Sequence, residues 1–194
     1  MAYDAKKFMK NTKKLTLSAL LLAIGIILPF FTGQIPQIGN MLLPMHIPVL
    51  ICGYICGGKY GGLIGFMLPL FRSVCFGRPL MMPTGIAMAF ELATYGIIVG
   101  ILYENFKKTK IGLYISLISS MVIGRIVWGI VSYLLFQLMG NRFTWELFIA
   151  GVFLEAIPGL ILQIIFVPAV VMRLQKTRIL EMVRQNSSYV KYNK

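Results

Sequence analysis

The chain has 194 residues, of which 58% are hydrophobic and 13% are charged, with a mean hydropathy of +0.80 and a formal net charge of +13. Soluble domains average about 45–50% apolar and about 25% charged residues, so this composition excludes an ordinary soluble domain and indicates an integral membrane protein. The length predicts a single membrane domain, 1–194.

Most basic residues lie in short clusters that flank or separate the apolar segments. These clusters are Lys6, Lys7, Lys10, Lys13 and Lys14; Lys107, Lys108 and Lys110; and Arg173, Lys176, Arg178 and Arg184. This is the positive-inside pattern of a protein that crosses the bilayer several times. We therefore interpret the basic residues as those that set the orientation of the protein in the membrane and that also attract anionic lipid. We expect membrane lipid, and no nucleic acid, as a partner.

Six apolar segments follow one another, and a spanning helix needs about 20 mostly apolar residues. They are 14–31, 45–57, 60–76, 83–103, 111–138 and 144–173. We predict an all-α, six-transmembrane-helix bundle with 1–13 and 174–194 as basic cytoplasmic tails, so that both termini lie inside the cell. Lysines and arginines concentrate on the predicted cytoplasmic segments, which favours six spans over five. Two spans within 45–76 require a tight turn at 57–59, and the alternative is a helical hairpin that does not fully cross.

Small residues recur every four positions in two of these segments. Ala19 and Ala23 form one such pair, and Gly53, Gly57, Gly61 and Gly65 form a longer series. This spacing lets helix backbones approach closely in lipid. It fits either packing inside the bundle or a docking surface for a partner membrane protein.

The familiar catalytic motifs are missing from the sequence. Residues 53–59 nearly match a phosphate-binding loop, but Tyr60 replaces the required Ser or Thr, so we expect no ATP hydrolysis by this chain. The one histidine, His46, and the nearby Cys52 and Cys56 have poor spacing for tetrahedral zinc, so we expect no metal and no cofactor on this chain. His46 either anchors a helix at the outer interface or hydrogen-bonds a ligand there.

Three charged residues fall near the middle of apolar segments: Glu91, Arg125 and Glu155. A charge at membrane depth costs about 2.5–3.5 kcal/mol on insertion scales and normally faces a protein interior or a cavity. Small and polar residues share their helix faces, namely Thr84, Ala87 and Tyr95; Trp128, Gly129 and Ser132; and Gly159 and Gln163. We predict a polar pocket inside the bundle. The charged residues either form a structural Arg–Glu pair or contact ligand, and both roles are compatible.

Arg72 and Arg78 lie at the outer end of the third segment and in the loop that follows it. Their side chains either extend to lipid headgroups or attract an anionic solute to the mouth of the pocket.

This layout resembles the substrate-binding S components of energy-coupling factor (ECF) vitamin transporters over nearly the whole chain. Ala19-Leu-Leu-Leu-Ala23 matches the A-x-x-x-A motif on the first helix of that family. The stretches 44–62 (PMHIPVLICGYICGGKYGG) and 87–96 (AMAFELATYG) also resemble the family.

The resemblance implies a transport subunit in the plasma membrane of a prokaryote. A vitamin or related micronutrient would bind near the outer face, between helices four to six and the loop after helix one. The expected substrate-binding residues are His46, Arg72, Arg78, Glu91, Tyr95, Arg125, Trp128, Glu155 and Gln163. Ala19 and Ala23 would dock on a transmembrane coupling (T) component, and two partner ATPase subunits would use ATP.

The substrate is left open at this point. The chain lacks the Met-x-His start of the nickel and cobalt members, which argues against metal transport. The outer arginines favour an anionic vitamin such as pantothenate or niacin, whereas Glu91 and Glu155 suit a cationic or neutral one. The alternatives to a transport subunit are a small intramembrane enzyme that uses buried Glu and His groups, and a structural membrane subunit without a ligand.

Overall fold

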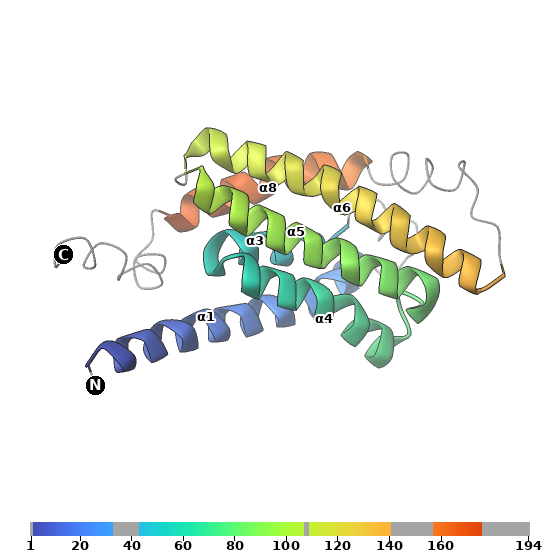
Figure 1. The fold of residues 1–194 in the computed structure, drawn as a ribbon, viewed down its shortest axis with the longest axis horizontal. Coiled ribbons are helices and arrows are strands. Elements are labelled where there is room, and N and C mark those ends of the chain that lie inside the picture. The colour runs from blue at the N-terminus through green and yellow to red at the C-terminus, as the bar shows by residue number, and fades with distance from the viewer. Residues whose placement is uncertain (1, 33–42, 107–108, 141–156, 176–194) are drawn as a thin grey trace.

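The computed structural model describes residues 2–32, 43–106, 109–140 and 157–175, and all regular elements in these ranges are helices (Figure 1). In chain order they are α1 (Ala2–Ile27), η1 (Leu28–Thr32), α3 (His46–Cys56), α4 (Gly58–Phe76), η2 (Met81–Gly85), α5 (Ile86–Asn105), α6 (Lys110–Leu138) and α8 (Ile157–Gln175). The predicted all-α fold is therefore confirmed for the described residues.

Local sequence explains where several helices begin and end. α1 starts at Ala2, so the predicted basic tail is the first part of this helix, and α1 ends two residues before Pro29, which lacks a backbone N–H. Only Gly57 separates α3 from α4, and its φ of 95° lies where glycine is strongly favoured. The tight turn expected at this point is therefore present. Thr109 caps α6 by accepting a hydrogen bond from the Gly112 N–H at 3.0 Å.

Four stretches in the described residues are long and apolar enough to cross a membrane. They are Asn11–Phe31, Met81–Asn105, Lys110–Leu138 and Ile157–Gln175. The helix α3 is apolar but has only 11 residues, about 16 Å at the rise of an α-helix, against a hydrocarbon core of about 30 Å. Residues 144–156 of the sixth predicted segment lie outside the described ranges. The count of six spans and the orientation of the termini stay predictions.

Contacts between neighbouring helices fix their directions. Lys14 and Ser18 of α1 meet Cys56 and Cys52 of α3, so these two helices are antiparallel. α3 is parallel to α5, because His46 lies near Glu91 and Tyr54 packs on Tyr103. α4 and α6 are antiparallel to α5: Gly58 and Gly65 lie against Ile97 and Leu92, and Gly124 and Arg125 lie against Tyr95 and Glu91. α8 runs in the same direction as α5 (Figure 1). The helices lie side by side along the long axis of the molecule, with α5 in contact with α3, α4 and α6 (Figure 1).

Glycines bring α3, α4 and α5 into backbone contact. A Cβ atom at position 61 would lie 2.7 Å from the Gly53 Cα and 2.9 Å from the Gly96 carbonyl oxygen. A Cβ at position 96 would overlap the backbone of Gly61. The glycine series of the sequence therefore packs inside the bundle, and Gly53, Gly61 and Gly65 are all buried. Of the two interpretations of this spacing, packing inside the bundle or docking of a partner, the structure therefore shows the first for the glycines.

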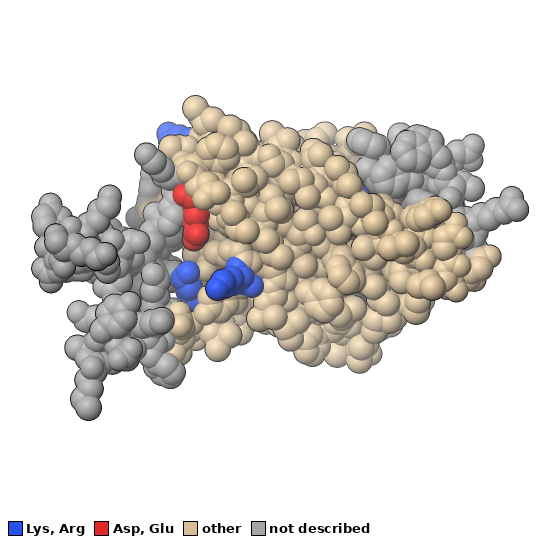
Figure 2. Space-filling model, in the orientation of Figure 1, with Lys and Arg blue, Asp and Glu red and all other residues tan. Residues whose placement is uncertain are grey.

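Charged side chains gather at one end of the bundle (Figure 2). On the face drawn there, almost all the visible Lys, Arg, Asp and Glu atoms lie at the end where α1 begins. The helix directions bring Lys14, Lys59, Lys110 and Arg173 to this end. The asymmetry predicted from the sequence is therefore present in the fold, whereas the side of the membrane that this end faces stays a prediction.

We predict that Gly96→Ala lowers the free energy of unfolding by about 1–3 kcal/mol, the usual cost of overpacking, because its methyl group would overlap the backbone of Gly61. Thermal unfolding of the purified protein in detergent measures this loss. Val122→Ile adds one carbon on the exposed face of α6 and should change stability by less than about 0.5 kcal/mol. Equal unfolding midpoints for the two variants would contradict the close-packing role of Gly96.

Candidate functional site

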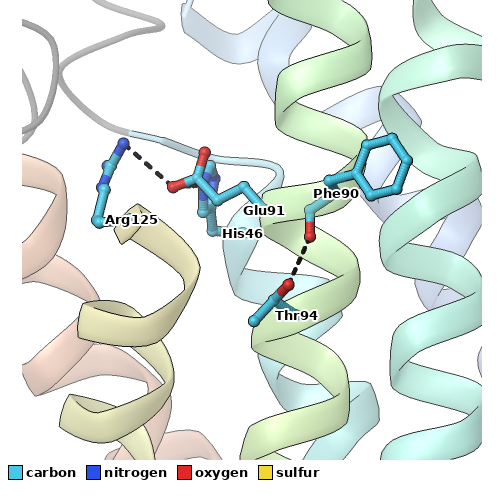
Figure 3. A network of polar contacts seen from close by, with 5 residues as sticks. All are labelled: His46, Phe90, Glu91, Thr94 and Arg125. Atoms are coloured by element: carbon cyan, nitrogen blue, oxygen red, sulfur yellow. Dashed lines mark hydrogen bonds and ion pairs between the residues drawn. The ribbon is translucent and has the colours of Figure 1, made fainter. Parts of the chain in front are cut away.

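A charged network lies inside the bundle where α3, α5 and α6 meet (Figure 3). Arg125 of α6 points toward Glu91 of α5, with 3.1 Å between the arginine Nη1 and the glutamate Oε1. The Nε2 of His46, the first residue of α3, lies 3.6 Å from the same oxygen. The first of these distances makes an ion pair, and the second is longer than a hydrogen bond. One carboxylate thus has two basic neighbours from two helices.

The network is almost completely withdrawn from the surface. His46 and Glu91 are at most 1% exposed, and Arg125 is 9% exposed. Tyr95, one turn after Glu91 on α5, is fully buried and packs its ring against His46 with 5.2 Å between centroids. Gly124 leaves room for this tyrosine, since a Cβ there would overlap the Tyr95 ring. We refer to His46, Glu91, Tyr95 and Arg125 as the polar cluster.

The polar cluster contains more hydrogen-bonding groups than it uses. Among the described residues, no hydrogen-bond partner is found for the Nε and Nη2 of Arg125, either ring nitrogen of His46, or the hydroxyl of Tyr95. Leaving a buried polar group unsatisfied costs about 1–3 kcal/mol. Thr94, by contrast, bonds to the Phe90 carbonyl of its own helix at 2.7 Å and takes no part in the cluster (Figure 3).

Gln163 of α8 belongs at the same height in the bundle. Gln175, the last residue of α8, donates to the Tyr103 hydroxyl, which aligns the ends of α8 and α5. Gln163 lies twelve residues before Gln175 on α8, and Glu91 lies twelve residues before Tyr103 on α5. Each interval is about 18 Å along its helix, so Gln163 and Glu91 lie at about the same level. Gln163 is fully buried, and neither side-chain atom has a partner among the described residues. α8 packs against α3 and α6, so this buried amide lies at the level of the polar cluster on a neighbouring helix.

The remaining residues predicted for the site are more scattered. Trp128 on α6 is half-buried, and Arg78 lies exposed after the end of α4. Glu155 lies outside the described residues. The structure thus brings His46, Glu91, Tyr95 and Arg125 together, with Gln163 at their level. For Trp128, Arg78 and Glu155, substrate binding stays a prediction.

Arg72 has structural partners at the end of α1. It is 3% exposed and donates to the Ile26 carbonyl. Its guanidinium lies 5.3 Å and 5.5 Å from the ring centroids of Phe30 and Phe76. The side chain therefore joins α4 to α1 and η1. The sequence had suggested instead that it extends to lipid headgroups or attracts an anionic solute. A role for Arg72 in substrate binding also stays a prediction.

Ala19 and Ala23 lie on the outward face of α1. Both are exposed, whereas Ser18, Leu21 and Gly25 turn inward toward α3 and α4. Leu15 and Ile27 continue the exposed face at 57% and 54% exposure. The small-residue pair is therefore accessible to a partner, and its docking role stays a prediction.

Sequence reasoning missed how far inside the bundle His46 lies. It assigned this residue to the outer interface, but α3 starts inside the bundle beside the second turn of α5, so His46 is fully buried and lies next to Glu91. The length of the apolar segment 45–57, too short for a full span, was the available signal. No group of three or more His, Cys, Asp or Glu side chains that could hold a metal occurs among the described residues.

A buried ion pair with unsatisfied polar neighbours, inside a bundle of apolar helices, is typical of membrane proteins that handle polar solutes. The family model for the ECF transporter substrate-specific component matches residues 13–171, and the chain belongs to this family. Its members are transport subunits rather than enzymes, and they work in membranes with a T component and ATPase modules. The comparisons with curated proteins and with solved structures gave no match.

We predict strong coupling between Glu91 and Arg125 in a double-mutant cycle. Arg125→Gln leaves a buried carboxylate without its charged partner and should cost about 3–5 kcal/mol of unfolding free energy. Adding Glu91→Gln should recover part of that loss, with a coupling energy of about 0.5–3 kcal/mol. Thermal unfolding of the two single variants and the double variant measures the cycle, and strictly additive losses would contradict a structural pair.

Proposed function

We propose that this chain is the binding subunit of an ECF-type importer that captures a water-soluble vitamin or related micronutrient. In this proposal the solute enters from the outer face, and ATP-driven uptake is carried out by a separate coupling module of one T component and two ATPase subunits. The chain itself binds no cofactor. It resides in the plasma membrane of a prokaryote as a six-span protein with both termini inside.

The observation that supports this proposal best is the surplus of polar groups in and beside the polar cluster. A purely structural ion pair is best stabilised when its remaining hydrogen-bond groups are also satisfied. Here Arg125, His46, Tyr95 and Gln163 keep buried donors and acceptors without partners in the described part of the chain. A polar solute in their midst would supply these partners. A structural subunit without a ligand leaves the surplus unexplained.

An enzymatic role has less support. Glu91 has both of its neighbours on one oxygen, and Arg125 holds it as an ion pair. The family to which the chain belongs consists of transport subunits. We therefore assign the buried carboxylate to the construction of the solute site and not to acid–base chemistry.

We predict that the purified protein retains a vitamin through detergent extraction. Mass spectrometry of the solute released by denaturation would identify it, and a binding assay across a panel of water-soluble vitamins would confirm it. The Val122→Ile variant, whose change lies on the exposed face of α6, serves as the control and should retain the same solute. A protein that retains no solute and binds none of the panel would refute the proposed function.

We also predict that Ala19→Trp and Ala23→Trp abolish uptake in cells while solute binding by the purified protein is unchanged. A large side chain on this exposed face would block close approach of a partner helix. Ala169→Trp is the matched control, because Ala169 is exposed on α8, away from α1, and should leave uptake intact. Normal uptake by both α1 variants would remove the docking role.

A further inference from the structure

The unpaired atoms of Arg125 form one particular edge of its guanidinium. Glu91 occupies the Nη1 side, whereas the Nε and Nη2 have no partner among the described residues. The N–H groups of Nε and Nη2 point the same way and form the fork that receives the two oxygens of a carboxylate. The side chain is thus fixed at one edge by the protein and available at the other.

Other favourable groups lie at the same level of the bundle. α3 begins at His46, whose N–H donates to the Leu43 carbonyl at 3.1 Å, so the positive end of the α3 helix dipole lies at the polar cluster. The Gln163 amide, fully buried and without a partner in the described part of the chain, adds a further donor at this height. Arginine has no acceptor atom, so the free groups favour a ligand that brings acceptors.

The charges of the cluster set the charge of the ligand. The formal charges of Glu91 and Arg125 cancel each other. A single carboxylate therefore adds one negative charge to the buried site, whereas a dianionic phosphate adds two and is more costly to bury. A cation would have to approach the Glu91 carboxylate beside another positive charge, because the Arg125 Nη1 already lies 3.1 Å from its Oε1.

We propose that the Nε–Nη2 edge of Arg125 binds a carboxylate group of the solute, and that the substrate is a monocarboxylic acid. This inference rests on the proposed function and names the chemical class of its substrate. Glu91 acts as a positioning residue that holds the guanidinium with its free edge toward the ligand. The Gln163 amide supplies a further donor, and the positive end of the α3 dipole favours the same group.

The test compares matched solutes that differ only in this group, nicotinate against nicotinamide and pantothenate against pantothenol, together with the solute released from the purified protein. The wild type should retain or bind a monocarboxylate and bind its uncharged counterpart about tenfold to hundredfold more weakly. The double variant Glu91→Gln/Arg125→Gln, which leaves no unpaired buried charge of this pair, should lose that preference. Arg173→Gln, at the far end of α8, should keep it.

Each outcome decides the inference. A preference for the carboxylate that disappears in the double variant and persists in the Arg173 variant supports it. Retention of a solute without a carboxylate, equal binding of both members of a pair, or an unchanged preference in the double variant overturns it and leaves the proposed function intact. Absence of any bound solute refutes the proposed function, and this inference fails with it.

Discussion

The buried carboxylate of Glu91 is the constraint that the surrounding helices must satisfy. A charge at membrane depth costs about 2.5–3.5 kcal/mol on insertion scales, and Glu91 is 1% exposed. Arg125 and His46 approach the same oxygen from α6 and α3, so the two helices and α5 must keep one fixed register. The position of these helices along the bundle axis therefore depends on one ion pair and its neighbour.

Close backbone packing makes this register possible. In lipid, apolar side chains gain little by leaving the hydrocarbon, so helices associate mainly through dense packing and internal polar contacts. Gly53, Gly61 and Gly96 remove the side chains that would separate α3, α4 and α5. The same device recurs at Gly124, which admits the Tyr95 ring beside the polar cluster. The glycines and the charged network are thus two parts of one arrangement, since the first brings the helices close enough for the second to form.

The sequence was sufficient for the class of fold and for much of the site. Hydropathy predicted the helices α4, α5 and α6 closely, because long apolar runs without alternation have few other stable forms in a membrane. Four-residue spacing placed Glu91 and Tyr95 on one buried face, and the mid-segment positions of Glu91 and Arg125 indicated their pairing. Depth was harder to predict: His46 and Arg72 depend on where α3 begins and how α1 ends. Those boundaries come from tertiary packing, which a single sequence does not encode locally.

The short helix α3 connects α1 to the polar cluster. At its first residue it contributes His46 to the polar cluster, and at its last the Lys14 side chain of α1 donates to the Cys56 carbonyl at 2.8 Å. One turn earlier, Ser18 of α1 contacts the Cys52 sulfur at 3.4 Å, on the helix that presents Ala19 and Ala23 outward. An α-helix of 11 residues is about 16 Å long. Its two ends therefore contact the buried cluster and α1, so one short helix links the polar cluster to the helix that presents Ala19 and Ala23.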